Sequence, residues 1–295
     1  MIPIDLDVVT VESLDGARAI MALDGGHVLS WTPAGDSDDR LFVSERSTYG
    51  PGKAIRGGIP VIFPQFGPFG DLPQHGFARV SRFTAEPIAH DPSRMRLTLR
   101  DTDSTRALWP FQFDLEIDVH VEARSLALTM TVRNVDMEYA EFTAAFHPYF
   151  AMRHAYAATV AGLAGGSYRD ALRDGAVVDE DAPVLAITGP LDRIYFEAPD
   201  RLVIHDGERQ LIIEKTGFPE AVVWNPGVDG VLVIKTPSAF SPTEPVAEAV
   251  IERLAHSPRA ILASFPGPRT GAAARRRLLE RQAPTYETPR AAVQA

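Results

Sequence analysis

Residues 111–122 alternate between apolar and polar side chains. Apolar side chains occupy every second position from Phe111 to Val121, and polar or charged side chains fill the positions between them. This period of two is typical of an antiparallel β-strand with one buried face. The same alternation resumes over residues 126–132 after a short link. The pattern predicts a β-hairpin within a larger sheet.

Further short runs of β-forming residues predict additional strands at residues 26–32, 41–44, 141–146, 202–204, 211–214 and 221–224. No amphipathic helical pattern separates these runs before about residue 235, which favours an all-β, mainly antiparallel sandwich or barrel.

The chain changes character after residue 226. Alternating β pattern gives way to a sequence rich in Ala, Arg and Pro, in which residues 244–254 and 272–282 are the predicted helices. We therefore predict one β-sandwich domain over residues 1–226 and a divergent, partly helical tail over residues 227–295. Completion of the sandwich by that tail is not expected.

Composition limits the class of protein. The chain has 295 residues, 45% of them hydrophobic, which is enough for a substantial core. It has no cysteine, so disulfides and thiol chemistry are excluded. The net charge of −10 disfavours a nucleic-acid-binding face, and no apolar run is long enough to span a membrane. The first residues lack the basic flank of a signal peptide, so we expect a soluble cytoplasmic protein.

Residues 56–79 carry most of the candidate chemistry. Arg56, Gln74, His75 and Arg79 lie there among five glycines and four prolines, a composition unsuited to a regular helix or a long strand. Such a segment is expected to form a loop that holds its polar side chains at set angles. Two arginines can bind one phosphate group regardless of the net charge, because close contacts outweigh distant, screened charges.

His147 and Asp192 are candidates from outside this loop. His147 follows a predicted strand and precedes Pro148, so it lies at a strand end where the ladder stops. Asp192 stands beside an arginine, and Trp224 closes another strand with an indole ring suited to an apolar floor. The other histidines are expected to be structural or at the surface: His27, His90, His120, His154, His205 and His256.

Six segments together resemble the hexose-6-phosphate mutarotases, or glucose-6-phosphate 1-epimerases, of the aldose 1-epimerase superfamily. They are GGHVLSWTP at residues 26–34, AIRGGIPVIFPQFGP at 54–68, LPQHGFAR at 72–79, FHPYF at 146–150, LDRIY at 191–195 and VVWNP at 222–226. The resemblance implies a galactose-mutarotase-like β-supersandwich without metal or organic cofactor. It also implies interconversion of the α and β anomers of a hexose 6-phosphate, with glucose 6-phosphate as the expected substrate.

The resemblance also implies roles for individual residues. His147 would protonate the ring oxygen of the sugar, and His75 would hold or polarise the same region. Asp192 would hydrogen-bond to sugar hydroxyl groups. Arg56 and Arg79, with help from Gln74, would hold the ligand and its 6-phosphate.

The chain departs from the family pattern at the general base, which in the family is a glutamate on a later strand. By spacing, Glu248 is the nearest match and Glu244 the second, and neither lies in a strand-like context. Two explanations remain open for the tail. It is either a genuine replacement of the closing strands or the product of a reading-frame shift near residue 227.

Three functions remain open at this point. The first is a mutarotase that acts as a monomer on a small-molecule hexose phosphate. The second is a non-catalytic sugar-phosphate binding protein that lacks the general base. The third is a metal-dependent β-barrel sugar isomerase with His75, His147 and a carboxylate as ligands, since two histidines and an acid are a common metal set.

Overall fold

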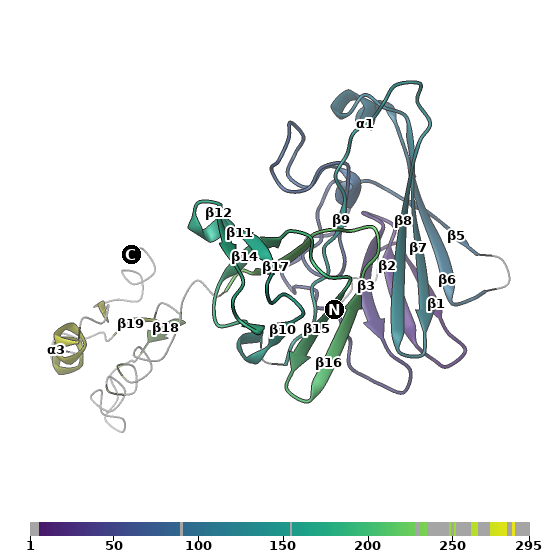
Figure 1. Ribbon diagram of the computed structural model, residues 1–295. Coiled ribbons are helices and arrows are strands. Elements are labelled where there is room, and N and C mark those ends of the chain that lie inside the picture. The colour runs from purple at the N-terminus through teal and green to yellow at the C-terminus, as the bar shows by residue number, and fades with distance from the viewer. Residues whose placement is uncertain are drawn as a thin grey trace. The chain divides into compact units, whose positions relative to one another are not determined.

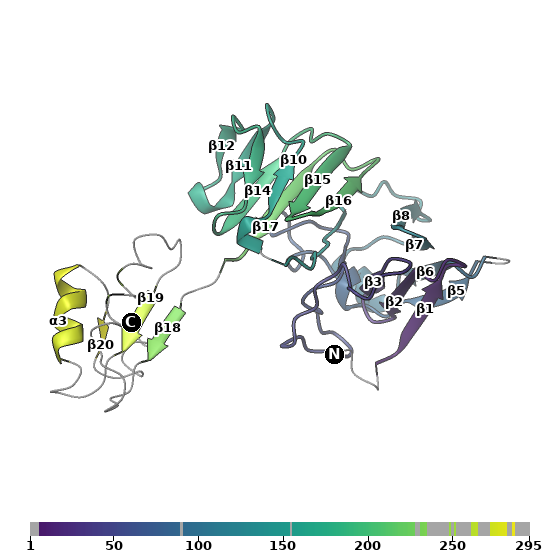
Figure 2. The ribbon, with the colours of Figure 1, turned by 90° about the horizontal axis from the view of Figure 1, so that it is seen from below.

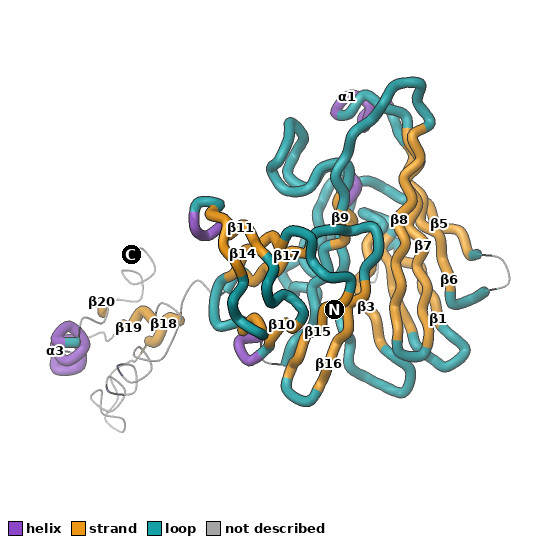
Figure 3. The backbone as a smooth tube through the Cα atoms, in the orientation of Figure 1, coloured by secondary structure: helices purple, strands orange, loops and turns teal. Residues whose placement is uncertain are grey.

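The computed structural model describes residues 6–88, 91–153, 155–227, 231–234, 248, 251, 261–264, 272–281 and 285–286. The chain forms two compact units, Met1–Met152 and Arg153–Ala295. This division differs from the predicted boundary at residue 226, which stays a prediction. Strands make up most of the regular structure in both units (Figure 3).

The first unit contains nine strands and one short α-helix among the described residues (Figure 1). In chain order they are β1 Val8–Glu12, β2 Arg18–Ala22, β3 His27–Thr32, β4 Val61–Ile62, β5 Thr84–Pro87, β6 Arg94–Arg100, α1 Asp103–Leu108, β7 Phe113–Glu122, β8 Ser125–Asn134 and β9 Ala145–Phe146, with a 3-10 turn at Ala78–Val80.

The predicted hairpin is confirmed as β7 and β8. The two strands pair antiparallel from Phe113 opposite Asn134 to Glu122 opposite Ser125, and the apolar side chains of β7 are buried at every second position. The strand begins at Phe113 rather than Phe111. The hairpin is half of a four-stranded antiparallel sheet in the order β5-β6-β7-β8 (Figure 1).

The core of the first unit lies between this sheet and the three-stranded sheet β1-β2-β3. Strand β1 packs against β6 and β7. Met21 and Ala19 from the smaller sheet, with Leu97 and Ile117 from the larger, are completely buried. Two antiparallel sheets that share an apolar core in this way form a β-sandwich.

Two sequence predictions in the first unit need correction. Residues 41–44 are not a strand, because only Leu41 and Val43 form isolated bridges. The strand predicted over residues 141–146 is limited to Ala145–Phe146. The short helix α1, which follows the capping residue Thr102, was not predicted at all.

No helix in the described part of the chain is long and apolar enough to cross a membrane.

The second unit contains two four-stranded antiparallel sheets, in the orders β13-β10-β15-β16 and β12-β11-β14-β17 (Figure 2). Their strands are β10 Thr159–Ala161, β11 Ser167–Asp170, β12 Ala176–Asp179, β13 Val184–Ala186, β14 Leu191–Tyr195, β15 Arg201–Asp206, β16 Arg209–Glu214 and β17 Ala221–Asn225. The predictions for residues 202–204, 211–214 and 221–224 are confirmed by β15, β16 and β17.

The tail has a different architecture. Strands β18 Val231–Ile234, β19 Ile261–Ser264 and β20 Thr285–Tyr286 pair in parallel, and helix α3 Ala272–Glu280 lies between β19 and β20 in the chain. Helix α3 confirms the helix predicted over 272–282. The helix predicted over 244–254 lies mostly outside the described residues. The tail strands were not predicted, because short apolar runs do not distinguish a strand from a buried helix.

His27 is a buried histidine at the start of β3. Its ring is fully buried, and its Nε2 lies 2.7 Å from the carbonyl oxygen of Gly57, to which it donates. The structural role expected for this histidine is confirmed. Burial lowers the pKa of His27 from 6.5 to about 4, against a smaller opposing effect of the hydrogen bond to Gly57. The side chain is therefore neutral at pH 7.

His27 should make the stability of the fold depend on pH. Below pH 6.5 the unfolded chain protonates His27, whereas the folded chain does so only near pH 4. The free energy of unfolding should therefore fall by about 3 kcal/mol between pH 7 and pH 4 through this residue alone. Urea unfolding of wild type and His27→Gln at both pH values tests this, because the glutamine variant lacks the titration.

His120→Gln is the matched control, since His120 lies on the partly exposed face of β7. It should keep the wild-type pH dependence. If His27→Gln loses as much stability as wild type on acidification, the buried neutral state of His27 is wrong.

Candidate active site

His147 is held by backbone hydrogen bonds on both sides of its segment. Strand β9 pairs antiparallel with β4, with Phe146 opposite Val61. Beyond the pair, the His147 N–H donates to the Pro60 carbonyl at 3.1 Å, and the Tyr149 N–H donates to the Gly58 carbonyl at 2.8 Å. On the other side, the Phe42 N–H donates to the Tyr149 carbonyl at 2.8 Å. The strand-end position predicted for His147 is confirmed.

The carbonyl oxygen of Phe63 anchors the loop that carries His75. It accepts hydrogen bonds from the N–H groups of Phe77 at 3.0 Å and Ala78 at 3.1 Å. The backbone approaches so closely that a β-carbon on Gly76, whose φ is +66°, would lie 2.3 Å from this oxygen. Only glycine fits there, and this contact fixes the residue next to His75.

His75 adopts a left-handed backbone conformation with φ of 68°, which is unusual for a residue with a side chain. Its Nδ1 accepts a hydrogen bond from the Gly67 N–H at 3.1 Å, and its own N–H donates to the Gly67 carbonyl at 3.1 Å. Because a backbone N–H can only donate, Nδ1 is the unprotonated nitrogen. In the neutral ring, the proton is therefore on Nε2.

The two candidate histidines lie close together. The ring centres of His75 and His147 are 5.9 Å apart, with the rings at 86°. Tyr149 stacks on the other histidine, with its ring centre 4.8 Å from that of His147 at an interplanar angle of 18°. Phe66 contacts His75 edge-on, at 5.5 Å between ring centres. The sequence prediction that His75 and His147 meet is therefore supported by the geometry.

Electrostatics favour a neutral His75. Burial, the positive charge of Arg79 and the proximity of His147 together lower the pKa of His75 from 6.5 to about 4, with burial the largest cause. At pH 7 the ring presents a proton on Nε2 without carrying a charge. Such a ring can donate a hydrogen bond to an oxygen atom. A protonated His75 would instead be a third cation in the cluster formed by His75, His147, Tyr149, Arg56 and Arg79.

Arg79 and Arg56 lie near the same tyrosine. Burial lowers the pKa of Arg79, and burial raises the pKa of Tyr149 against the opposing charges of Arg79 and Arg56. One guanidinium N–H of Arg79 donates to the Gln74 carbonyl at 2.7 Å. The side chain of Gln74 is exposed.

The absence of a carboxylate partner distinguishes Arg56 and Arg79 from other arginines of the first unit. No Asp or Glu among the described residues forms an ion pair with either guanidinium. By contrast, ion pairs are formed by Arg40, Arg82, Arg96, Arg106 and Arg133. Arg79 is half-buried, whereas Arg56 is exposed. A guanidinium group without a counter-ion is suited to binding an anionic ligand.

Asp192 and Glu248 belong to the second unit. Asp192 lies on β14, directly opposite Trp224 on β17, so these two candidates are cross-strand neighbours. Glu248 is helical, and its carboxylate lies 2.5 Å from the Nε of Arg277 on α3. Glu244, the second candidate base, lies outside the described residues.

Tyr149 and Gln65 are site residues that the sequence analysis missed. The spacing of Tyr149 from His147 was a usable signal, because residues two apart in an extended segment point to the same side. Gln65 carried no such signal, since its role depends on how the loop turns back on itself.

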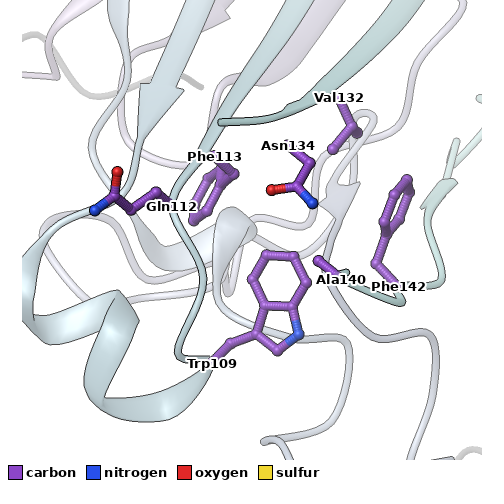
Figure 4. A pocket seen from close by; sticks show the side chains of 7 residues that line it. All are labelled: Trp109, Gln112, Phe113, Val132, Asn134, Ala140 and Phe142. Carbon is purple, nitrogen blue, oxygen red and sulfur yellow. The ribbon is translucent and has the colours of Figure 1, made fainter. Parts of the chain in front are cut away.

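A separate cavity of about 80 Å³ lies elsewhere in the first unit (Figure 4). Its lining residues are Trp109, Gln112, Phe113, Val132, Asn134, Ala140 and Phe142. Figure 4 shows the indole of Trp109 turned toward Asn134 and Ala140. None of the predicted site residues contributes to this lining.

The described residues contain no side-chain group that matches the metal site of the third predicted function. Among them, no three histidine or acidic side chains form a group that could hold a metal ion. His75 and His147 instead have aromatic rings and arginines as neighbours.

Comparison with known proteins identifies the family of this chain. The profile of the family described as Aldose 1-epimerase matches residues 7–250, a range that includes Glu248. A Cenchrus ciliaris protein named "Putative glucose-6-phosphate 1-epimerase" is 33% identical over 239 residues, covering 76% of this chain and 71% of the relative. An Escherichia coli K12 protein of the same name is 32% identical over 232 residues, covering 76% and 75%.

Solved structures agree. A Salmonella typhimurium protein described as a "putative mutarotase" has 30% identity and a TM-score of 0.68, covering 76% of this chain and 75% of its own. A galactose mutarotase-like protein from Lactobacillus casei, at 18% identity and a TM-score of 0.63, covers 75% and 83% and shares the fold. The predicted all-β, galactose-mutarotase-like fold is thereby confirmed. The chain belongs to the aldose 1-epimerase family.

Proposed function

We propose that the protein interconverts the α and β anomers of a hexose 6-phosphate, with glucose 6-phosphate as the principal substrate. The observation that carries this proposal is the pair of arginines that have no carboxylate partner among the described residues, beside two histidines. The names of the relatives from Cenchrus ciliaris and Escherichia coli, putative glucose-6-phosphate 1-epimerases, support the same substrate.

The phosphate is assigned to Arg56 and Arg79. A phosphate dianion would provide the counter-ion that these guanidinium groups lack, and charge-assisted hydrogen bonds to it are stronger than neutral ones. Gln74, whose carbonyl already holds Arg79 in place, is positioned to help. A sugar without phosphate would leave both cations uncompensated, so the site should prefer the phosphorylated form.

The reaction requires one proton to leave the anomeric hydroxyl and another to reach the ring oxygen. In the proposed mechanism, a carboxylate base takes the first proton and His147 supplies the second, which breaks the bond between C1 and the ring oxygen. The open aldehyde rotates about its C1–C2 bond. The protons then return in the opposite sense, and the ring closes on the other face of the carbonyl.

The remaining residues orient the sugar. His75, neutral with its proton on Nε2, donates a hydrogen bond to an oxygen of the sugar and keeps that region polarised. Asp192 accepts hydrogen bonds from sugar hydroxyl groups. We assign the general base to Glu248, the nearest glutamate by spacing to that of the family.

A second function is favoured by one observation. Glu248 already forms an ion pair with Arg277, and a base engaged in this way is poorly placed to accept a proton from a sugar. The alternative is a sugar-phosphate binding protein that lacks catalysis. Thermal stabilisation by glucose 6-phosphate without any increase in the rate of anomer exchange would support that alternative.

The phosphate assignment predicts a selective loss on substitution of Arg79. Arg79→Gln should raise the KM for glucose 6-phosphate roughly 10- to 100-fold, because one or two charge-assisted hydrogen bonds are lost. Exchange of unphosphorylated glucose should change little. Anomer exchange measured by NMR with both sugars tests this, with Arg100→Gln, an exposed arginine paired with Asp114, as the control.

Two results would count against the proposal. Equal exchange of glucose and glucose 6-phosphate by wild type would remove the phosphate assignment. Exchange of glucose 6-phosphate no faster than in buffer would remove the enzymatic function and leave the binding protein.

The proton-transfer roles predict large losses of rate with little change in binding. His147→Ala and Glu248→Gln should each lower kcat for glucose 6-phosphate by about two to four orders of magnitude, because each removes a proton-transfer group. Exchange NMR under saturating substrate measures kcat directly. Glu280→Gln, which changes an exposed glutamate of α3, should retain the wild-type rate. An unaffected Glu248→Gln variant would place the base on another residue.

A further inference from the structure

Gln65 is a buried polar side chain that the mechanism does not use. It is 5% exposed and makes three hydrogen bonds within the loop. Its Nε2 donates to the carbonyls of Gly67 at 3.2 Å and Leu72 at 3.0 Å. Its Oε1 accepts from the Leu72 N–H at 3.0 Å. The amide therefore uses both of its donors on the two ends of a turn formed by residues 67–72.

The same turn controls His75. The carbonyl of Gly67 accepts from Gln65 and from the His75 N–H, while the Gly67 N–H donates to His75 Nδ1. Gly67 is thus the shared partner of the buried amide and of the imidazole. The Gly67 N–H and carbonyl belong to the two peptide units that meet at its α-carbon, so a displacement of Gly67 would alter the hydrogen bond to Nδ1.

The base of the loop is fixed independently of Gln65. The Phe66 N–H donates to the hydroxyl of Thr143 at 2.8 Å, and the Thr143 N–H donates to the Pro64 carbonyl at 2.9 Å. Beyond Phe66, the Gly67 carbonyl accepts hydrogen bonds from the Gln65 side chain and the His75 N–H. A residue at positive φ, such as His75, persists only where its surroundings over-determine its conformation.

We propose that Gln65 is a positioning residue: it holds Gly67 through the Gly67 carbonyl, so that the Gly67 N–H donates to His75 Nδ1 and sets the Nε2-protonated tautomer of His75. The tautomer decides whether Nε2, the ring nitrogen that does not bond to Gly67, donates or accepts a hydrogen bond. With the proton on Nε2, that nitrogen donates to a sugar oxygen; with the proton on Nδ1, it could only accept. The catalytic part of this inference rests on the proposed mutarotase function, whereas the tautomer does not.

The experiment compares Gln65→Met and Gln65→Glu with wild type. Methionine has a similar length without polar atoms, and glutamate keeps the acceptor for Leu72 but loses both donors. Long-range ¹H–¹⁵N NMR of histidine-labelled protein reports the tautomer, and the His75→Gln variant assigns the His75 signals. We expect Nε2-protonated His75 in wild type, and in both variants nitrogen shifts moved toward the average of the two tautomers.

A third variant tests the proposal without substituting Gln65, in case the Gln65 variants do not fold. A β-carbon on Gly70 would lie 2.3 Å from Gln65 Oε1, so Gly70→Ala displaces the amide without replacing it. It should shift the His75 signals in the same direction. Gln112→Met is the matched control, because Gln112 is an exposed glutamine of the same unit. The His75 signals of this variant should equal those of wild type.

Kinetics test the catalytic part. In Gln65→Met, kcat for glucose 6-phosphate should fall roughly 10- to 100-fold through misplacement of His75, while KM changes little because the arginines are retained. An unchanged His75 tautomer in folded Gln65→Met and Gly70→Ala would overturn the proposal. A changed tautomer with wild-type kcat would overturn its catalytic part. A wild-type protein without exchange activity would overturn the proposed function, and the tautomer measurement would still decide the role of Gln65.

Discussion

Close backbone packing around the loop is the constraint on which the candidate site depends. A β-carbon on Gly58 would lie 2.2 Å from the carbonyl oxygen of Val28, and one on Gly76 would lie 2.3 Å from that of Phe63. These contacts attach the two ends of the loop to the buried strands β3 and β4. Because the backbone is fixed, the side chain of His75 starts from a defined position, and less of its conformational entropy remains to be lost on binding.

The same packing brings His147 into the cluster. Residues 146–149 hydrogen-bond to the strand that leads into the loop, so His147 and His75 share one rigid support. A site built from adjoining strands holds its geometry better than one built from free loops. The stacking of Tyr149 on His147 adds a second restraint on the imidazole.

Local charge outweighs net charge in this protein. The chain carries a net charge of −10, yet the cluster contains a histidine that burial keeps neutral and two arginines that no carboxylate pairs with in the described part of the chain. Charges separated by more than a Debye length of roughly 8–10 Å are largely screened, so the distant acidic residues contribute little to an anion bound there. The neutral His75 limits repulsion within the cluster and preserves a hydrogen-bond donor.

The sequence by itself determined the β-hairpin at residues 113–134, because strict alternation has only one low-energy outcome when one face is buried. Motifs at residues 54–79 and 146–150 were sufficient to nominate His75, His147, Arg56 and Arg79. Only the tertiary structure decided which nitrogen of His75 carries the proton and why Gln65 matters. Those features depend on a peptide brought back by a turn, and no periodicity in the sequence records the direction of one N–H group.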